Sequence, residues 1–433
     1  MRPAAKPPPS NLSVVHEGWL EHDGVRLHYI EWEATDPGED DGTALFLLHG
    51  LSANARYWER FAARFPHRRL VALDQRSHGA SDRPPTGYEI ETVAADAAHA
   101  IREIGLDRPV VAGHSWGCTT ALALAGLHPD LVSGLAVIDG PVQPMSERLA
   151  WGDVMRLMQP PLPRYASLKQ AYAQARTYVG NAWGEDLQPG VDAGFIRDGD
   201  AWVLPLTSGV RLQILRHMYD FQPQILWARL EVPALLALAG ADVAMRSWKE
   251  EGAASVAEVA PGADVRWYDS RHDIPQIAPD PLAADVERLC LEAGFNEMAR
   301  RLSELDGDYS RKANAGWSAR DLLAHLASTQ SAMASVVRAP APTGQPGGQA
   351  GSEPFDSTRW NASQLRKRAD LPVEALVKEL ESGTAELLAA LRETDLTKVL
   401  SVGSYAGRTV ASGMRAMVRH QHEHLAELES VLE

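Results

Sequence analysis

Short continuous runs of apolar residues alternate with longer amphipathic stretches between Leu12 and about Ala293. Continuous apolar runs of about four to eight residues are typical of strands buried on both faces of a parallel sheet. The alternation therefore predicts an α/β fold, in which helices cover a mostly parallel sheet. Strands are expected at Ala44–Leu48, Leu70–Leu73, Pro109–Ala112, Leu135–Ile138, Ala234–Ala239 and Val265–Tyr268, after a hairpin that turns at Asp23-Gly24. Helices are expected near Tyr57–Phe65, Ile90–Ile104, Cys118–Leu127, Ser247–Val259 and Pro281–Ala293.

One interval, about 141–230, separates two predicted strands by far more than the usual loop of about two to six residues. This length predicts an inserted helical cap over the sheet. The cap is rich in aromatic residues, namely Trp151, Tyr165, Tyr172, Tyr178, Trp183, Phe195, Trp202, Tyr219, Phe221 and Trp227. Each of them could belong to a small core of the cap, or to an apolar pocket above the sheet.

After Ala293 the pattern becomes entirely helical. Four amphipathic segments are expected to form a helix bundle, at Phe295–Leu305, Ser318–Val337, Pro372–Leu391 and Thr409–Leu432. Residues 339–354, rich in Pro, Gly and Gln, are expected to be a loop within this bundle. The predicted organisation is a disordered leader over 1–11, an α/β domain over 12–293 and a bundle domain over 294–433.

The sequence Gly113-His114-Ser115-Trp116-Gly117 follows a predicted strand and precedes a predicted helix. A G-x-S-x-G sequence in this context is typical of a nucleophile elbow, because small flanking residues permit a sharp turn that exposes the serine hydroxyl. The pattern predicts Ser115 as a nucleophile.

A serine nucleophile needs an imidazole to remove its proton and a carboxylate to orient that imidazole. His272 and Asp242 each follow a predicted strand, and we favour this pair. Asp139 also follows a strand and remains the alternative acid. Two backbone N–H groups, those of Leu51 and Trp116, are expected to stabilise the oxyanion.

These features together resemble the α/β-hydrolase superfamily, in its capped esterase, lactonase and C–C hydrolase branch. The matching segments are Leu47–Ser52, Asp74–Asp82, the elbow, Gly240–Asp242 and His272–Pro275. Ser77 stands where the family usually has glycine, which implies modest backbone strain. Dehalogenases and epoxide hydrolases of this fold have aspartate at the elbow, so a serine there excludes both chemistries. The resemblance implies a hydrolase site that needs no cofactor.

Three histidines mark the predicted bundle. His420 and His424 lie four residues apart on the last helix and share one face, whereas His422 points roughly the opposite way. His325 interrupts an apolar stretch of another helix, after a predicted N-cap at Ser318. Three histidines on bundle helices, two of them at i and i+4, are typical of an interior metal site.

The segments Trp317–Leu326 and Arg419–Leu428 resemble the DinB-like bundle superfamily, which includes metal-dependent thiol S-transferases and maleylpyruvate isomerase-type enzymes. The resemblance implies that His325, His420 and His424 bind a divalent ion such as zinc, nickel or iron. The ligand type does not choose among these metals.

Composition limits the partners. The net charge of −15 argues against nucleic acid or an anionic membrane surface as a general partner. Only two cysteines occur, so no disulfide framework is expected, and no run approaches the ~20 apolar residues of a spanning helix. The expectation is a cytoplasmic protein that acts on a small-molecule substrate.

The leading hypothesis is a serine hydrolase that cleaves an ester, lactone or related acyl bond of a small, largely apolar substrate. Two alternatives concern the bundle. It could transfer a low-molecular-weight thiol through a metal-bound thiolate, or it could be a non-catalytic module that stabilises or dimerises the protein around a structural metal.

Overall fold

The computed structural model describes residues 16–314, 316–340 and 355–432. Contacts divide these residues into two compact units, one up to Gly38 and over Gly42–Leu289, the other comprising Glu39–Asp41 and the chain from Cys290. The observed division lies a few residues before the predicted boundary at 293/294. The observed division falls within a single helix, α11 (Pro279–Glu304). The sequence pattern predicts two separate helices over this segment. The predicted leader and most of the predicted loop at 339–354 lie outside the described residues.

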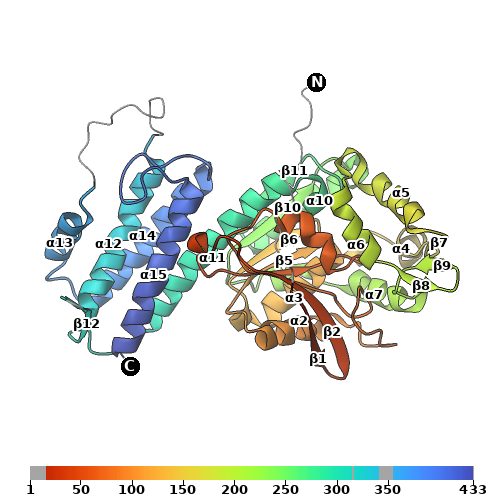
Figure 1. The fold of residues 1–433 in the computed structure, drawn as a ribbon, viewed down its shortest axis with the longest axis horizontal. Helices are drawn as coiled ribbons and strands as arrows, with labels where there is room; N and C mark the ends of the chain where they lie inside the picture. The colour runs from red at the N-terminus through yellow and green to blue at the C-terminus, as the bar shows by residue number, and fades with distance from the viewer. Residues whose placement is uncertain (1–15, 315, 341–354, 433) are drawn as a thin grey trace. The chain divides into compact units, whose positions relative to one another are not determined.

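The first unit is built on an eight-stranded sheet with the order β1-β2-β4-β3-β5-β6-β10-β11. The strands are β1 (His16–His22), β2 (Val25–Trp32), β3 (Leu45–Leu48), β4 (Leu70–Leu73), β5 (Val110–His114), β6 (Gly134–Ile138), β10 (Ala234–Ala239) and β11 (Asp264–Tyr268). The strands β1 and β2 form the predicted hairpin, and all pairs from β4 to β11 are parallel. The α/β prediction is confirmed (Figure 1).

Every residue of β3, β4, β5, β6 and β10 is buried, as their continuous apolar sequences require. The accompanying helices and 3-10 turns are η1 (Pro37–Glu39), η2 (Ala55–Trp58), α1 (Glu59–Ala62), α2 (Ile90–Ile104), α3 (Trp116–Leu127), η3 (Pro129–Leu131), α9 (Val243–Val259) and α10 (Ile274–Ile277). Since β5 lies between β3 and β6, the segments that leave these three strands meet at one edge of the sheet.

The cap between β6 and β10 contains helices and a small three-stranded sheet, β7-β9-β8. Its elements are η4 (Met145–Glu147), α4 (Trp151–Met158), β7 (Arg164–Tyr165), α5 (Leu168–Val179), η5 (Gly180–Ala182), η6 (Glu185–Leu187), α6 (Gln188–Ala193), β8 (Ile196–Asp198), β9 (Ala201–Val203), α7 (Ser208–Asp220) and α8 (Pro223–Trp227). Most of its aromatic rings pack on one another, in the pairs Trp151 and Tyr219, Tyr165 and Phe195, and Tyr172 and Trp183. Phe221 and Trp227 belong instead to the core of the first unit, which packs on the eight-stranded sheet.

The second unit is the predicted helix bundle. It contains the C-terminal part of α11, together with α12 (Ala319–Arg338), α13 (Ser357–Lys367), α14 (Val373–Glu393), α15 (Val410–Leu432), and the short strands β12 (Lys312–Asn314) and β13 (Trp317–Ser318). Helices α12, α14 and α15 run side by side, as Figure 1 shows, and their apolar faces form two core clusters. A capping box of Ser318 and Asp321 begins α12, as predicted. Among the described helices, none is both long and apolar enough to cross a membrane.

A buried ion pair fixes the first part of α11 within the first unit. Arg68, fully buried just before β4, donates through Nε to Glu287 Oε2 at 2.9 Å and through Nη2 to Oε1 at 3.1 Å. Burial alone would raise the pKa of Glu287, but Arg68 and His67 outweigh this effect and lower that pKa well below its ordinary value. Glu287 is therefore ionised, and its charge compensates a guanidinium that water does not reach.

Replacing Glu287 with alanine is expected to destabilise the first unit by about 3–5 kcal/mol, because it leaves the Arg68 charge buried and unpaired. Chemical denaturation measures this loss. The matched control is Asp280→Asn, on the same helix, where the carboxylate paired with Arg64 is 79% exposed; it should cost about 1 kcal/mol or less. Equal losses in the two variants would contradict the prediction.

Candidate functional site

Ser115 occupies a strained turn between β5 and α3. Its φ of 55° and ψ of −119° lie in a region that non-glycine residues rarely adopt. The two glycines of the elbow are needed because the backbone closes tightly around this turn. A Cβ on Gly113 would lie 2.4 Å from Gly117 O, and one on Gly117 would lie 2.2 Å from Leu48 O. The elbow geometry is thus present, and Ser115 remains partly exposed.

The carboxylate that contacts His272 is Asp139, and not Asp242, the residue that the sequence analysis favoured as the acid. His272 Nδ1 lies 2.7 Å from Asp139 Oδ2. Asp242 instead accepts a hydrogen bond from the Ala244 N–H and serves as the N-cap of α9. The physical reason is that α9 begins at Val243, well before the predicted start at Ser247, and its first turn requires an N-cap.

Asp139 lies at the end of β6, and three donors converge on its buried side chain. Besides His272, the Ala239 N–H donates to Oδ1 at 2.9 Å, and Lys249 Nζ lies 2.7 Å and 2.9 Å from Oδ1 and Oδ2. Burial by itself would raise the pKa of Asp139, but His272 and Lys249 outweigh it and lower the pKa. The acid is therefore held ionised and in one orientation. The sequence analysis did not identify Lys249, and no motif marks it.

The His272 side chain is 52% exposed. Burial of its ring opposes charging, but the hydrogen bond and the charge of Asp139 outweigh this effect and raise the pKa of His272 above 6.5. Among the described residues, no hydrogen bond joins Ser115 Oγ to the His272 ring. Such catalytic contacts often tighten only when substrate is bound.

Neighbouring residues fix the loop that carries His272. His114 Nε2 lies 3.0 Å from the His272 carbonyl oxygen, and the pKa of His114 is lowered to about 4 by burial and by the nearby His272. Tyr57 stacks on His114 and donates its hydroxyl to Asp273 at 3.2 Å. Asp273 is thus a loop carboxylate, and His114 is a structural neighbour of the site.

Trp116 belongs to the elbow, and Leu51 lies on the segment that follows the neighbouring strand β3. Trp116 is the first residue of α3, and Leu51 follows β3, which pairs with β5 at Leu48 and Gly113. A Cβ on Gly50 would lie 3.0 Å from Ser115 Cβ, so the segment before Leu51 approaches the serine closely. The geometry places both residues beside Ser115.

Other polar residues near the elbow have structural contacts. His49 Nε2 accepts from the Gln75 N–H, and His78 Nε2 accepts from the Ser52 N–H, each at 3.1 Å. Ser77 has a φ of 65°, which agrees with the backbone strain expected for a serine at a position where the family usually has glycine. Cys118 is buried, with its thiol 3.0 Å from Gly113 O.

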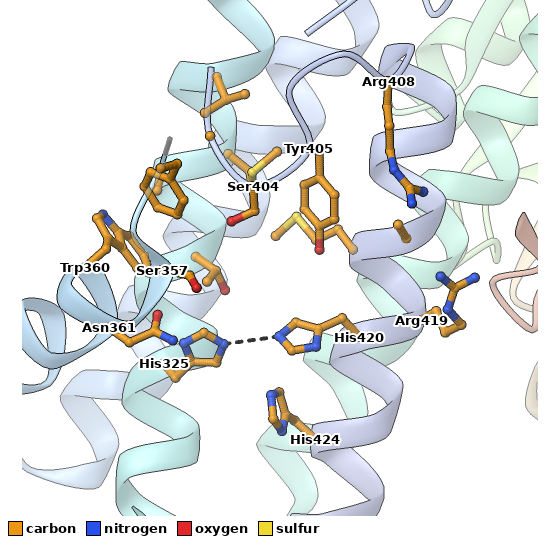
Figure 2. A pocket seen from close by; sticks show the side chains of 18 of the residues that line it. His325, Ser357, Trp360, Asn361, Ser404, Tyr405, Arg408, Arg419, His420 and His424 are labelled. Carbon is orange, nitrogen blue, oxygen red and sulfur yellow. Dashed lines mark hydrogen bonds between the residues drawn. The ribbon is translucent and has the colours of Figure 1, made fainter. Parts of the chain in front are cut away.

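The second site lies in the bundle, where His325, His420 and His424 face one another (Figure 2). One potential ligand atom from each lies within 4.8 Å of the others. His325 projects from α12, and the other two project from α15. His422 is on the other face of α15, where burial lowers its pKa and Asp41 and Arg301 are near. The three predicted histidines are thus brought together, and His422 faces away as predicted.

These donors fit a divalent metal ion. Two nitrogens bound to zinc in a tetrahedral site lie about 3.3 Å apart, and the distance from His325 Nε2 to His420 Nε2 is 3.3 Å. His424 Nδ1 lies 3.3 Å from Glu427 Oε2, an outer carboxylate of the kind that orients a histidine ligand. Burial, together with the two other rings, lowers the pKa of His325 to about 3. His325 is therefore neutral, which is the form that binds metals.

A cavity of about 680 Å³ opens on the three histidines. Its lining includes Trp360 and Asn361 of α13 and Tyr405, which Figure 2 shows around the histidine cluster. The sequence analysis missed α13, because this helix has no buried residue and hence no apolar stripe to reveal it. A three-histidine centre beside a cavity leaves coordination positions open to a ligand.

Comparison with protein families agrees with this two-part structure. Residues 43–182 match the family described as alpha/beta hydrolase fold. Residues 291–426 match the family described as mycothiol maleylpyruvate isomerase N-terminal domain.

Two curated relatives match parts of the first unit. 2-(Acetamidomethylene)succinate hydrolase of Mesorhizobium japonicum is 36% identical over 99 residues, which are 23% of this chain and 36% of the relative. Epoxide hydrolase B of Mycobacterium tuberculosis is 29% identical over 206 residues, 46% of this chain and 54% of the relative. The matches thus span only about one third to one half of these relatives.

Solved structures show the fold. The crystal structure of E-2-(acetamidomethylene)succinate hydrolase matches with a TM-score of 0.54 at 18% identity, covering 64% of this chain and 99% of the other. The thioesterase domain from the curacin biosynthetic pathway also matches with a TM-score of 0.54 at 18% identity, with coverages of 63% and 99%. The chain carries an α/β-hydrolase-fold domain followed by a mycothiol maleylpyruvate isomerase N-terminal domain, which is a DinB-like helix bundle.

Proposed function

We propose that the protein is a serine hydrolase that cleaves an ester, a lactone or a related acyl bond, with Ser115, His272 and Asp139 as its catalytic triad. The observation that carries the proposal is the strained elbow of Ser115 beside a histidine whose Nδ1 lies 2.7 Å from a buried, ionised aspartate. This combination supports acyl chemistry because it supplies an activated nucleophile and an oriented base.

The residues divide the reaction among them. His272 removes the Ser115 proton through Nε2 while Asp139 holds its Nδ1–H, and Ser115 Oγ attacks the acyl carbon. The backbone N–H groups of Leu51 and Trp116 then stabilise the developing oxyanion. The intermediate collapses as the protonated His272 gives its proton to the departing alcohol oxygen, and the acyl-enzyme remains. In the second half of the reaction His272 removes a proton from water, which attacks the acyl carbon, and the same proton returns to Ser115 Oγ as the free acid leaves.

The hydrolase names of the relatives support hydrolysis as the general activity. Ser115 stands at the elbow, where epoxide hydrolases of this fold have aspartate. This difference favours an acyl substrate over an epoxide. The expected substrate is a small molecule, and the expected compartment is the cytoplasm.

The histidine cluster supports a second proposed function for the bundle, namely binding of one divalent ion by His325, His420 and His424. Zinc, nickel and iron all suit three imidazoles. Bound there, such an ion would lower the pKa of a thiol presented from the cavity, which is the chemistry that a thiol transfer needs. A purely structural role for the ion is the alternative.

Ser115→Ala is expected to reduce ester hydrolysis by about 10⁴-fold or more, because no other group replaces the nucleophile. The measurement is nitrophenolate release from p-nitrophenyl esters, together with labelling by a fluorophosphonate probe. Circular dichroism should show an intact fold, since Ser115 is not a core residue. Label that persists at another residue would contradict the assignment.

Asp139→Asn is expected to lower kcat by about 10⁴-fold through loss of the partner that orients His272. Asp242→Asn should have little effect, because asparagine is an equally good N-cap. The pH profile gives an independent test. His272 must be neutral to act as a base, so wild-type kcat/KM should fall as the pH drops through a pKa above 6.5. Asp139→Asn removes the carboxylate that raises this pKa, so the acid limb should move to lower pH. A larger loss in Asp242→Asn would refute the assignment.

Elemental analysis of the purified full-length protein is expected to find about one divalent ion per chain. The double variant His420→Ala with His424→Ala should lose this ion, because one imidazole alone holds a metal weakly. His422→Ala is the matched control on the same helix and should retain the metal. Retention of the ion by the double variant would place the metal elsewhere.

A further inference from the structure

Arg211, on the cap helix α7, carries a charge that no carboxylate of the described residues neutralises. Its Nη1 donates to Ser52 Oγ at 2.5 Å, and its Nε donates to the Met158 carbonyl oxygen at 2.9 Å. Both partners are neutral. The Arg211 side chain is partly buried, and this burial lowers the pKa of its guanidinium.

Other buried or partly buried arginines of the same unit are neutralised. Each pairs with a carboxylate: Arg56 with Glu59, Arg60 with Asp186, Arg68 with Glu287, and Arg76 with Asp96. Acidic residues are also in excess, with 57 against 42 basic ones. The unpaired state of Arg211 thus distinguishes it from these four arginines, and its Nη2 has no hydrogen bond among the described residues.

The position of Arg211 connects it to the proposed active site. Its neighbours on α7, Val210 and Ile214, pack in one cluster with Trp116, which follows the nucleophile. Ser52, to which Arg211 donates, directly follows Leu51, a proposed oxyanion donor. The guanidinium is therefore held against the segment that is expected to bind the reacting acyl group.

A second guanidinium borders the same region. Arg271 immediately precedes His272, and its Nη1 donates to the Thr177 carbonyl oxygen at 3.0 Å, at the end of α5. No carboxylate of the described residues forms an ion pair with it. Tyr178, next to Thr177, is near enough to Arg211 to affect its pKa. Two arginines without a carboxylate partner among the described residues thus lie near the end of α5.

We propose that Arg211 binds a carboxylate of the substrate, and that the hydrolase therefore acts on acyl compounds that carry a carboxylate near the scissile bond. This rests on the proposed serine hydrolase function and refines it, because it replaces the largely apolar substrate predicted from the cap. A guanidinium is suited to this role, since its planar fork matches a carboxylate and its charge strengthens the hydrogen bonds.

The test compares two esters with the same leaving group, mono-p-nitrophenyl succinate and p-nitrophenyl butanoate, which differ chiefly in the terminal carboxylate. Wild-type kcat/KM is expected to be higher for the succinate. Arg211→Met should lower kcat/KM for the succinate by about 100-fold, mainly through KM, and should change that for the butanoate by less than about threefold. Arg211→Lys should restore part of the preference. Arg216→Met is the matched control, because Arg216 is on the same helix but pairs with Asp220.

Equal rates of the wild type on both esters, or equal losses on both in Arg211→Met, would overturn the proposal and leave Arg211 a structural role. Failure of the hydrolase function itself is recognised separately, by fluorophosphonate labelling of Ser115. If the wild type cleaves neither ester and Ser115 is not labelled, both proposals fall. If Ser115 is labelled and only the carboxylate preference is missing, the substrate proposal alone falls.

Discussion

The close approach of three backbone segments at the end of β5 is the constraint on which the first unit depends. Ser115 adopts its unusual turn only because Gly113 and Gly117 let β5, β3 and the start of α3 pass within distances that exclude a side chain. The same packing sets Leu51 beside the serine. Since β6 is the other neighbour of β5, it also determines which acid can reach the site. Strain at one residue thus organises the surrounding loops.

The elbow and the buried strands could be predicted from the sequence, but the carboxylate that contacts His272 could not. Continuous apolar runs identify buried strands, and the glycine spacing identifies Ser115. Asp139 and Asp242 could not be separated in this way, because each follows one of two adjacent strands, β6 and β10. The decision depends on where α9 begins, and helix starts are the least certain part of a sequence prediction. Recognising that the helix starts directly after Asp242 would have identified that residue as an N-cap.

In the bundle, the spacing of His420 and His424 reveals their common face, because helical periodicity is a local property. Their meeting with His325 is a tertiary contact, which periodicity alone does not show. It was predicted from the presence of three histidines on bundle helices together with the family resemblance. The polar helix α13 shows the limit of such reasoning. It contributes Trp360 and Asn361 to the cavity, yet it buries no residue and leaves no hydrophobic signal. Helices that line a cavity without burying apolar side chains in a core are hard to detect from the apolar pattern of the sequence.

The contact between Lys249 and Asp139 has a consequence for the leaving group. The ammonium shares the carboxylate with His272 and reduces the proton affinity that Asp139 alone would give the imidazole. A weaker base is a stronger conjugate acid, so a contact that slows removal of the serine proton also speeds delivery of that proton as the acyl bond breaks. In the proposed serine hydrolase mechanism, the contact therefore assists leaving groups that must take up a proton as they depart, such as aliphatic alkoxides.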